Sequence, residues 1–250
     1  MKCLPLYITL LLLVSCLLPS CISVRPYSIA TLGAENTPYS SLFYNGKDTS
    51  ALYASANVFS SSNAYHRKES NFFARFDLHK THVHKMGAYS YGAFGYRGSY
   101  SIRDFEPFEG HKNFYGLGAR TEALLRLQLG NVQIEPIGIG LSFLHEGGSF
   151  RRFRRRANRS GYIIDGSPGW LDLNLSALNK VSWRLANKKS LGVNFALGKN
   201  FSNKSIDNLT FVSGFHLQLD DTYIRFALAE GSLGRSNQSL LMLGIQFKLR

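Results

Sequence analysis

Residues 239–250 read SLLMLGIQFKLR, a run in which large apolar side chains alternate with smaller or more polar ones. One parity holds Leu241, Leu243, Ile245, Phe247 and Leu249, and the other holds Met242, Gly244, Gln246, Lys248 and Arg250. Successive side chains of a β-strand point to opposite faces of the sheet, so this pattern predicts a strand with one continuous apolar face. That face needs a core or a membrane beside it.

The same period of two recurs through most of the chain, and helical periodicity is nearly absent. Boundaries at turn residues predict ten strands, at 50–62, 68–79, 83–102, 113–129, 132–146, 169–185, 190–202, 207–219, 222–230 and 238–249. Several exceed the roughly five or six residues of an average soluble strand. They suit the tilted strands of a membrane barrel, about 9–11 residues within the bilayer. Eight strands remain an alternative, because the run 89–96 alternates poorly.

The predicted connections fall into two classes. After the even-numbered strands they are tight, at 80–82, 130–131, 186–189 and 220–221. After the odd-numbered strands they include the long segments 103–112, 147–168 and 231–237, besides shorter loops near His66 and Asn203. Such asymmetry is typical of outer-membrane barrels. The predicted fold is all-β, an antiparallel up-and-down transmembrane β-barrel over residues 49–250, with both ends of the chain on the short-turn, periplasmic side.

The last residues also resemble the assembly signal of Gram-negative outer-membrane β-barrel proteins, in which a glycine precedes two alternating large apolar or aromatic positions. Gly244, Phe247 and Leu249 stand at those positions. Met242 departs from the polar residue expected two places before the glycine, and the run continues to Arg250 without a terminal aromatic residue. The resemblance implies insertion into the outer membrane by the barrel-assembly machinery.

The first residues have the pattern of a targeting segment. Lys2 precedes an almost wholly apolar run over residues 4–18, which is too short to span a bilayer as a helix. We interpret residues 1–20 as a signal peptide. Residues 13–16 resemble the lipobox of bacterial lipoproteins, which implies cleavage before Cys16 and acylation of its thiol, and residues 18–21 give a second candidate at Cys21. Cleavage by the ordinary signal peptidase without lipidation is the alternative.

Residues 21–48 have little periodicity and contain Pro26 and Pro38. We interpret them as a periplasmic leader between a lipid anchor and the first strand, or as a partial plug of the barrel. All three cysteines lie within the first 21 residues, so the predicted barrel has no cysteine pair to oxidise.

The chain carries 29 Lys and Arg against 16 Asp and Glu, a formal net charge of +13, yet 44% of its 250 residues are hydrophobic and 13% aromatic. That composition is too apolar for a disordered basic tail. A strong positive charge often indicates nucleic-acid binding, but an exported protein rarely meets nucleic acid, and we expect none as a partner. The expected partners are outer-membrane lipid and the phosphorylated lipopolysaccharide of the cell's own surface.

Charged residues fall on the predicted inner faces of the strands. They are Arg75, Asp77, Arg120, Glu122, Arg126, Arg184 and Arg225, together with Asp172, Lys180, His216 and Lys248, and the polar residues Gln128 and Asn194 are expected inside with them. A barrel of eight to ten strands is scarcely wider inside than its side chains, so we interpret these as a structural network of paired charges. An ion-selective pore with a cationic lining is the alternative. Gly138 and Gly140 predict room beside the arginines of the strand at 113–129.

The segment 147–168 carries the strongest local signal, six arginines with Phe150 and Phe153 among or beside them. The arginines are Arg151, Arg152, Arg154, Arg155, Arg156 and Arg159. The planar guanidinium binds phosphate oxygens in bidentate fashion, which favours an anion-binding loop. Three interpretations stay open: a solvated loop without a partner, a loop that contacts lipopolysaccharide phosphates, and a site for another polyanion.

We assign no metal, cofactor or catalytic residue. The histidines His79, His82 and His84 cluster around a predicted turn, but no carboxylate or thiolate stands at a matching spacing. His145, Glu146, Ser149, Asp104 and Glu106 gather at predicted outer loops, without a surrounding catalytic motif. The leading interpretation is a non-enzymatic outer-membrane barrel with a structural or surface-interaction role. The alternatives are a soluble lipid-anchored barrel with an apolar ligand and an integral enzyme acting on lipid A or peptides, and the oligomeric state stays open.

Overall fold

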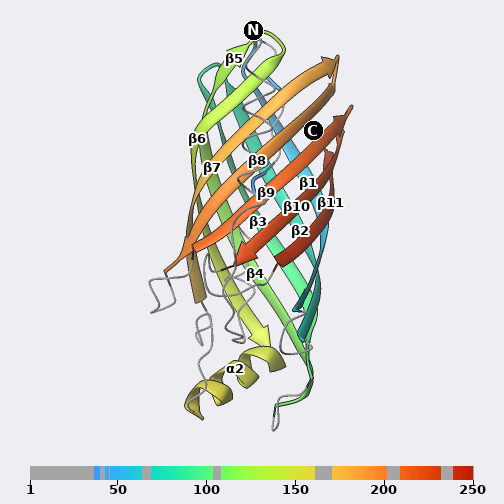
Figure 1. The fold of residues 1–250 in the computed structure, drawn as a ribbon. Helices are drawn as coiled ribbons and strands as arrows, with labels where there is room; N and C mark the ends of the chain where they lie inside the picture. Colours follow the sequence, from blue (N-terminus) through green and yellow to red (C-terminus); the bar gives the residue numbers. More distant parts are fainter. Residues whose placement is uncertain are drawn as a thin grey trace, which may run out of the picture.

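A computed structural model describes residues 37–39, 43–44, 46–63, 69–103, 108–160, 171–201, 209–231 and 239–249. The predicted signal peptide, with Cys16 and Cys21, lies outside the described residues. The described chain forms one sheet that curls into a tilted cylinder, with a helix across one end (Figure 1). None of the helices in the described ranges is long and apolar enough to cross a membrane.

The sheet consists of consecutive antiparallel strands. Their bounds are β1 Thr49–Asn63, β2 Glu69–His84, β3 Gly87–Ile102, β4 Gly110–Leu125, β5 Leu127–Leu129, β6 Val132–Gly148, β7 Leu171–Ala186, β8 Lys189–Asn200, β9 Leu209–Leu219, β10 Thr222–Gly231 and β11 Ser239–Lys248. The strands β4 and β5 both pair with β6 and are two parts of one strand interrupted at Arg126, so the barrel has ten strands. Pairing of β1 with β11 closes it. The predicted ten-stranded up-and-down barrel is confirmed.

Four tight turns gather at one end of the cylinder, which we call the tight-turn end. They lie at 85–86, 130–131, 187–188 and 220–221, and three of them use a residue with positive φ, namely Gly130, Lys188 and Asp220. The predicted first turn at 80–82 was wrong. Strand β2 continues because its inward parity runs on through Thr81, whose hydroxyl lies 2.8 Å from that of Ser90 on β3.

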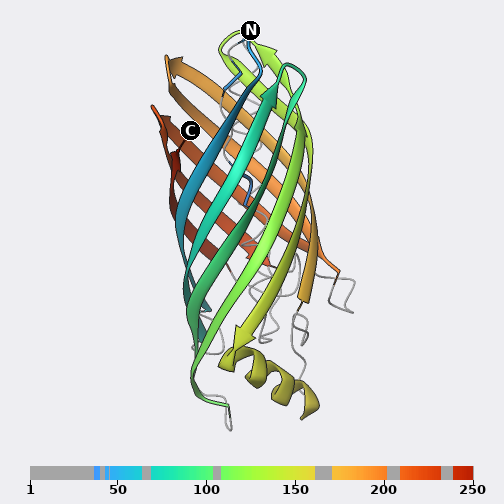
Figure 2. The same ribbon diagram turned by 180° about the vertical axis from the view of Figure 1, so that it is seen from behind.

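The predicted arginine loop was wrong in its first half. Residues Ser149–Arg159 form the helix α2, which lies across the opposite, long-loop end (Figure 2). Its buried positions are Phe150, Phe153, Arg154 and Ala157, the spacing of one face of a helix. The rest of the predicted loop, 161–168, lies outside the described residues.

The outer surface is apolar along the strands. In β11 and the residue after it, the outward side chains of Leu241, Leu243, Ile245, Phe247 and Leu249 are 37–57% exposed, and the intervening residues are mostly buried inside. A soluble barrel around an apolar ligand would place its polar face outward, so this parity is the one expected of a transmembrane barrel. One inward assignment was wrong, because Gln128 lies in the short β5, where every residue is exposed.

Glycines of the inner face make room for large neighbours. A Cβ at Gly118 would lie 2.2 Å from the Phe94 ring, and one at Gly98 would lie 2.2 Å from the Cβ of Phe73. The predicted space beside an arginine is present at Gly140, where a Cβ would lie 3.2 Å from a terminal nitrogen of Arg120, whereas a Cβ at Gly138 would lie 2.9 Å from the Leu124 side chain. The glycines therefore allow the lumen to fill with side chains.

Candidate functional site: a filled lumen and a cationic helix

The half of the lumen nearest the long-loop end is aromatic. The rings of Phe59 and Phe73 stack with centroids 4.4 Å apart, and Phe114 meets Phe73 edge-on at 5.7 Å. Tyr100 then contacts Phe150 of α2 at 4.3 Å. All five side chains are at most 2% exposed, so this end of the barrel contains a packed apolar core.

Helix α2 is docked onto that core by its apolar face and by one ion pair. Phe150 and Phe153 are buried against the aromatic residues, and Ala157 completes the face. The Arg154 guanidinium, 0% exposed, forms a buried salt bridge with Glu146 at the end of β6. Because Arg154 is committed to Glu146, it is not among the arginines that can meet an external anion.

The other arginines of α2 face outward. Arg152, Arg155, Arg156 and Arg159 are exposed, and Arg151 is half-buried. The helix α2 therefore has two faces, an apolar face docked on the barrel and an outer face that carries these five arginines. We call the second the cationic face. Its guanidinium groups bring positive charge to the long-loop end of the barrel.

Polar and charged side chains fill the lumen toward the tight-turn end. Arg75 and Asp77, two residues apart on β2, form a buried ion pair. Asn57 donates to Asp77 at 2.9 Å, and it accepts from Arg225 at 2.7 Å. These contacts join β1, β2 and β10 across the lumen, so the charges stabilise one another as well as the barrel wall.

A second charge cluster lies nearer the tight-turn end, and its central acid was missed by sequence reasoning. Arg126 donates to Glu135 at 2.5 Å, and the Lys180 ammonium lies 3.7 Å from the other oxygen of the same carboxylate. The register of β6 shifts between Glu135 and Gly138, so inward positions are odd before the shift and even after it. Pro136 was the available signal, because proline inside a strand marks a bulge or an edge.

Three more of the predicted lumen charges, Arg120, Glu122 and Arg184, contact residues that precede the first strand. Arg120 donates to the Thr37 carbonyl at 3.0 Å, and the Tyr39 amide donates to Glu122 at 3.1 Å. Arg184 donates to the Tyr44 carbonyl at 3.0 Å. Burial raises the pKa of the Tyr39 phenol to about 12, so the phenol is neutral at physiological pH. Residues 37–39 and 43–44 thus lie inside the barrel.

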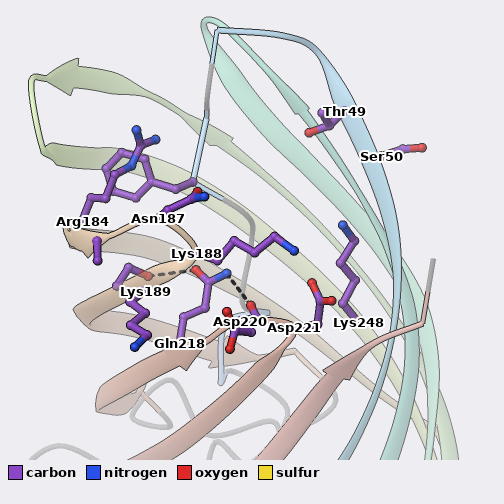
Figure 3. Close-up of a pocket in the computed structure, with 13 residues that line it drawn as sticks. Thr49, Ser50, Arg184, Asn187, Lys188, Lys189, Gln218, Asp220, Asp221 and Lys248 are labelled. Carbon is purple, nitrogen blue, oxygen red and sulfur yellow. Dashed lines mark hydrogen bonds between the residues drawn. The ribbon is translucent and has the colours of Figure 1, made fainter.

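The barrel mouth at the tight-turn end holds a cavity of about 270 Å³ (Figure 3). Arg184, Lys188 and Lys248 line it together with the acidic turn Asp220–Asp221. The Ser190 hydroxyl donates to Gln218 at 2.9 Å, and the Gln218 amide donates to the Asp220 carbonyl at 3.0 Å. The lining residues carry charges of both signs, and several of their polar groups form hydrogen bonds with one another. These features favour a solvent-accessible opening over a specific ligand-binding site.

The predicted histidine cluster is divided between the two faces of β2. His79 is buried in the lumen and stacks on Tyr39, with ring centroids 3.9 Å apart. His82 and His84 lie on the outer side, where both stack with Tyr89. Among the described residues, no three His, Cys, Asp or Glu side chains come together as metal ligands. The outer rings form a local aromatic patch on β2 and β3 next to the tight turn at 85–86.

The residues considered for catalysis that the structure describes do not come together as a catalytic site. Glu146 is buried against Arg154, while His145 is exposed on the outer surface, and Asp104 and Glu106 lie outside the described residues. Sequence reasoning missed a different pair. The Ser101 hydroxyl lies 2.6 Å from Nδ1 of His111, on neighbouring strands at the long-loop end.

The three residues that resemble the assembly signal lie on different sides of the barrel wall. Phe247 and Leu249 are 45% and 51% exposed on the outer surface, and Gly244 faces the lumen. A Cβ at Gly244 would lie 2.1 Å from the Asn57 side-chain oxygen. The glycine therefore makes room for the polar network at the β1–β11 closure.

The chain is similar in fold to solved outer-membrane barrels. It aligns with the translocator domain of the autotransporter NalP from Neisseria meningitidis at 11% identity, over 82% of this chain and 89% of that one, with a TM-score of 0.43. The β domain of the Bordetella autotransporter BrkA aligns at 11% identity, over 79% and 98%, with a TM-score of 0.44. An outer membrane channel from Pseudomonas putida F1 aligns at 8% identity, over 84% and 100%, with a TM-score of 0.43. No family model and no curated protein sequence matches. These likenesses concern the fold alone.

Proposed function

We propose that the protein is a non-enzymatic barrel of the Gram-negative outer membrane that binds the phosphates of lipopolysaccharide through α2. The proposal places the tight-turn end in the periplasm and the long-loop end at the cell surface. The observation that carries it is the division of α2 into a docked face and a cationic face. A merely solvated loop would need neither the buried phenylalanines nor the Arg154–Glu146 pair.

The electrostatics favour a dense anionic layer as the partner. A single exposed ion pair contributes about 1 kcal/mol or less, so the five arginines need closely spaced phosphates to act together. Docking onto the barrel fixes the helix backbone, which lowers the entropy lost on binding. Salt should weaken the attraction, since the Debye length falls to about 3 Å at 1 M.

The test is charge reversal on the exposed face. The triple variant Arg152→Glu, Arg155→Glu and Arg156→Glu should fold normally, because all three side chains are exposed. It should co-purify with less lipopolysaccharide than the parent, and the bound amount should depend less on salt concentration. Phosphate and lipopolysaccharide content are measured on the purified protein.

The matched control changes the same charge at the other end of the barrel. Lys85, Lys188 and Lys189 are exposed at the tight-turn end, and their triple replacement by Glu should leave lipopolysaccharide content unchanged. If the α2 variant retains as much lipopolysaccharide as the parent, with the same salt profile, the cationic face is only solvated. If both variants lose it equally, net charge rather than α2 is responsible.

We also propose that the mature protein carries a lipid at Cys16 or, failing that, at Cys21. Several acyl chains would anchor the N-terminus firmly, whereas one chain alone binds a membrane weakly. Intact-mass measurement of the mature protein should show loss of residues 1–15 or 1–20 together with the mass of the acyl groups. An unmodified N-terminus beyond Cys21 would exclude the lipid anchor.

A second candidate function is an integral-membrane esterase, and the Ser101–His111 pair is the observation that favours it. His111 Nδ1 can accept the serine proton while the hydroxyl oxygen attacks an ester carbonyl, and it can return that proton to the alkoxide as the ester C–O bond breaks. Water then hydrolyses the acyl-serine and restores the hydroxyl. A fluorophosphonate probe should then label Ser101, and Ser101→Ala should abolish labelling while Ser99→Ala on the same strand retains it. An unlabelled parent protein excludes this mechanism.

A further inference from the structure

We infer that the polar half of the lumen is a binding site for an extended polypeptide backbone, and that residues 37–39 and 43–44 of the described chain occupy it. We call these residues the lumenal segment. The inference does not depend on the proposed role of α2, because different residues at the other end of the lumen carry it. The inference assigns a binding partner to charged lumen side chains that would otherwise only stabilise the packing of the strands.

The deeper end of the lumenal segment is held by a pair of opposite charges on β4. The Arg120 guanidinium donates to the Thr37 carbonyl at 3.0 Å. The Tyr39 amide donates to both Glu122 oxygens, at 3.1 and 3.3 Å. Arg120 and Glu122 are themselves 3.1 Å apart and at most 3% exposed. The pair offers one hydrogen-bond donor and one acceptor at positions two residues apart on β4, which match a carbonyl and an amide two residues apart in an extended backbone.

The end nearer the first strand is held in the same manner by β6 and β7. The Tyr44 amide donates to the Gln133 side-chain oxygen at 2.9 Å, and the Tyr44 carbonyl accepts from Arg184 at 3.0 Å. The Arg184 guanidinium also lies 4.3 Å from the Phe43 ring centroid. Amide and carbonyl of one residue are therefore both satisfied by lumen side chains.

Most of this recognition is independent of the bound sequence. The hydrogen bonds go to main-chain groups, which every residue except proline offers in the same form. Tyr39 adds a buried aromatic side-chain anchor, with its ring centroid 3.9 Å from that of His79 and 5.5 Å from the Arg120 guanidinium. The site thus fits the class of extended peptides with an aromatic residue at that position.

Covalent attachment explains why this segment is the occupant. Only residues 45–48 separate Tyr44 from the start of β1, so the segment is held near its site at a high effective concentration. Residues 37–39 and 43–44 lie in the polar half of the lumen, and the aromatic core fills the other half.

The test is hydrogen exchange, measured by mass spectrometry on the full chain folded in detergent micelles. The peptide covering 37–44 should exchange at least about 100-fold more slowly than a synthetic peptide of that sequence. Glu122→Ala should raise exchange at least about tenfold, because it removes the acceptor of the Tyr39 amide. Glu122→Gln keeps an acceptor and should retain most of the protection.

Asn194→Ala is the matched control, since Asn194 is buried in the lumen on β8 and makes none of the hydrogen bonds described above. Exchange in the parent as fast as in the free peptide would overturn the inference. Equal acceleration by Asn194→Ala and Glu122→Ala would also overturn it, since a general loosening of the barrel would then be the cause. If Glu122→Ala does not fold, Gln133→Ala is tested in its place. It removes the acceptor of the Tyr44 amide and should accelerate the exchange of that amide.

Discussion

At the scale of the residue, the buried Arg154–Glu146 ion pair is one of the contacts that hold α2 on the barrel. Arg154→Ala removes the guanidinium that pairs with Glu146 in a fully buried site. Loss of one partner of a buried ion pair costs about 3–5 kcal/mol, so urea titration should show a large loss of stability or a separate early release of α2. Arg155→Ala on the exposed face should change stability by less than about 0.5 kcal/mol. Equal effects of the two substitutions would mean that the helix is not docked through Arg154.

Glycine at position 118 is required by the ring of Phe94. A Cβ there would lie 2.2 Å from that ring and 2.5 Å from the Phe143 carbonyl, so Gly118→Ala forces the aromatic packing apart. We expect a loss of about 1–3 kcal/mol in unfolding free energy. Gly95→Ala is the control, because its Cβ would lie 3.2 Å from the flexible end of Leu117 and at an ordinary contact distance of 3.8 Å from the Gly116 carbonyl. A smaller loss at Gly118 than at Gly95 would contradict the described packing.

At the scale of the strand, depth in the membrane should set the cost of a charge. Leu243 is 57% exposed in the middle of β11, and Leu125 is 57% exposed at the tight-turn end of β4. Leu243→Arg should cost about 2–4 kcal/mol, and Leu125→Arg roughly 0–1 kcal/mol, because charges near an interface remain hydrated. Unfolding free energies in lipid vesicles check this. Equal costs would show that the exposed stripe does not face lipid.

The strands were predictable because the alternation of apolar and polar side chains can be read directly from the sequence. In β11, every outward residue was identified from alternation alone, and the ten-stranded closed barrel followed. The helix α2 was missed because one of its buried positions is an arginine, and no periodicity of apolar residues reveals Arg154 as part of a docked face. Glu135 was missed because the inward-facing positions of β6 change from odd to even numbers near Pro136.

The lumenal segment could not be derived from any side-chain pattern. Its main hydrogen bonds involve the amides of Tyr39 and Tyr44 and the carbonyls of Thr37 and Tyr44, which carry no sequence signature. The sequence offered a leader and a plug as alternatives for residues 21–48. The lumenal contacts of the described part favour the plug for that part.

For the whole molecule, the filled lumen predicts a barrel that does not conduct. The aromatic core occupies one half of the interior, and residues 37–39 and 43–44 lie in the other half. The purified protein in a planar bilayer should therefore show no ion-conducting steps. Regular cation- or anion-selective steps would contradict this and restore the interpretation of a pore lined by Arg75, Arg120 and Arg225.

The central claim is that the chain folds as a closed ten-stranded barrel in a membrane. The most direct measurement is electrophoresis in dodecyl sulfate of the detergent-extracted protein, with and without heating. A closed barrel should resist the detergent unheated and migrate faster than the heated, unfolded chain, and it should be recovered from the membrane fraction. Identical migration of the heated and unheated samples, together with recovery in the soluble fraction, would contradict the account.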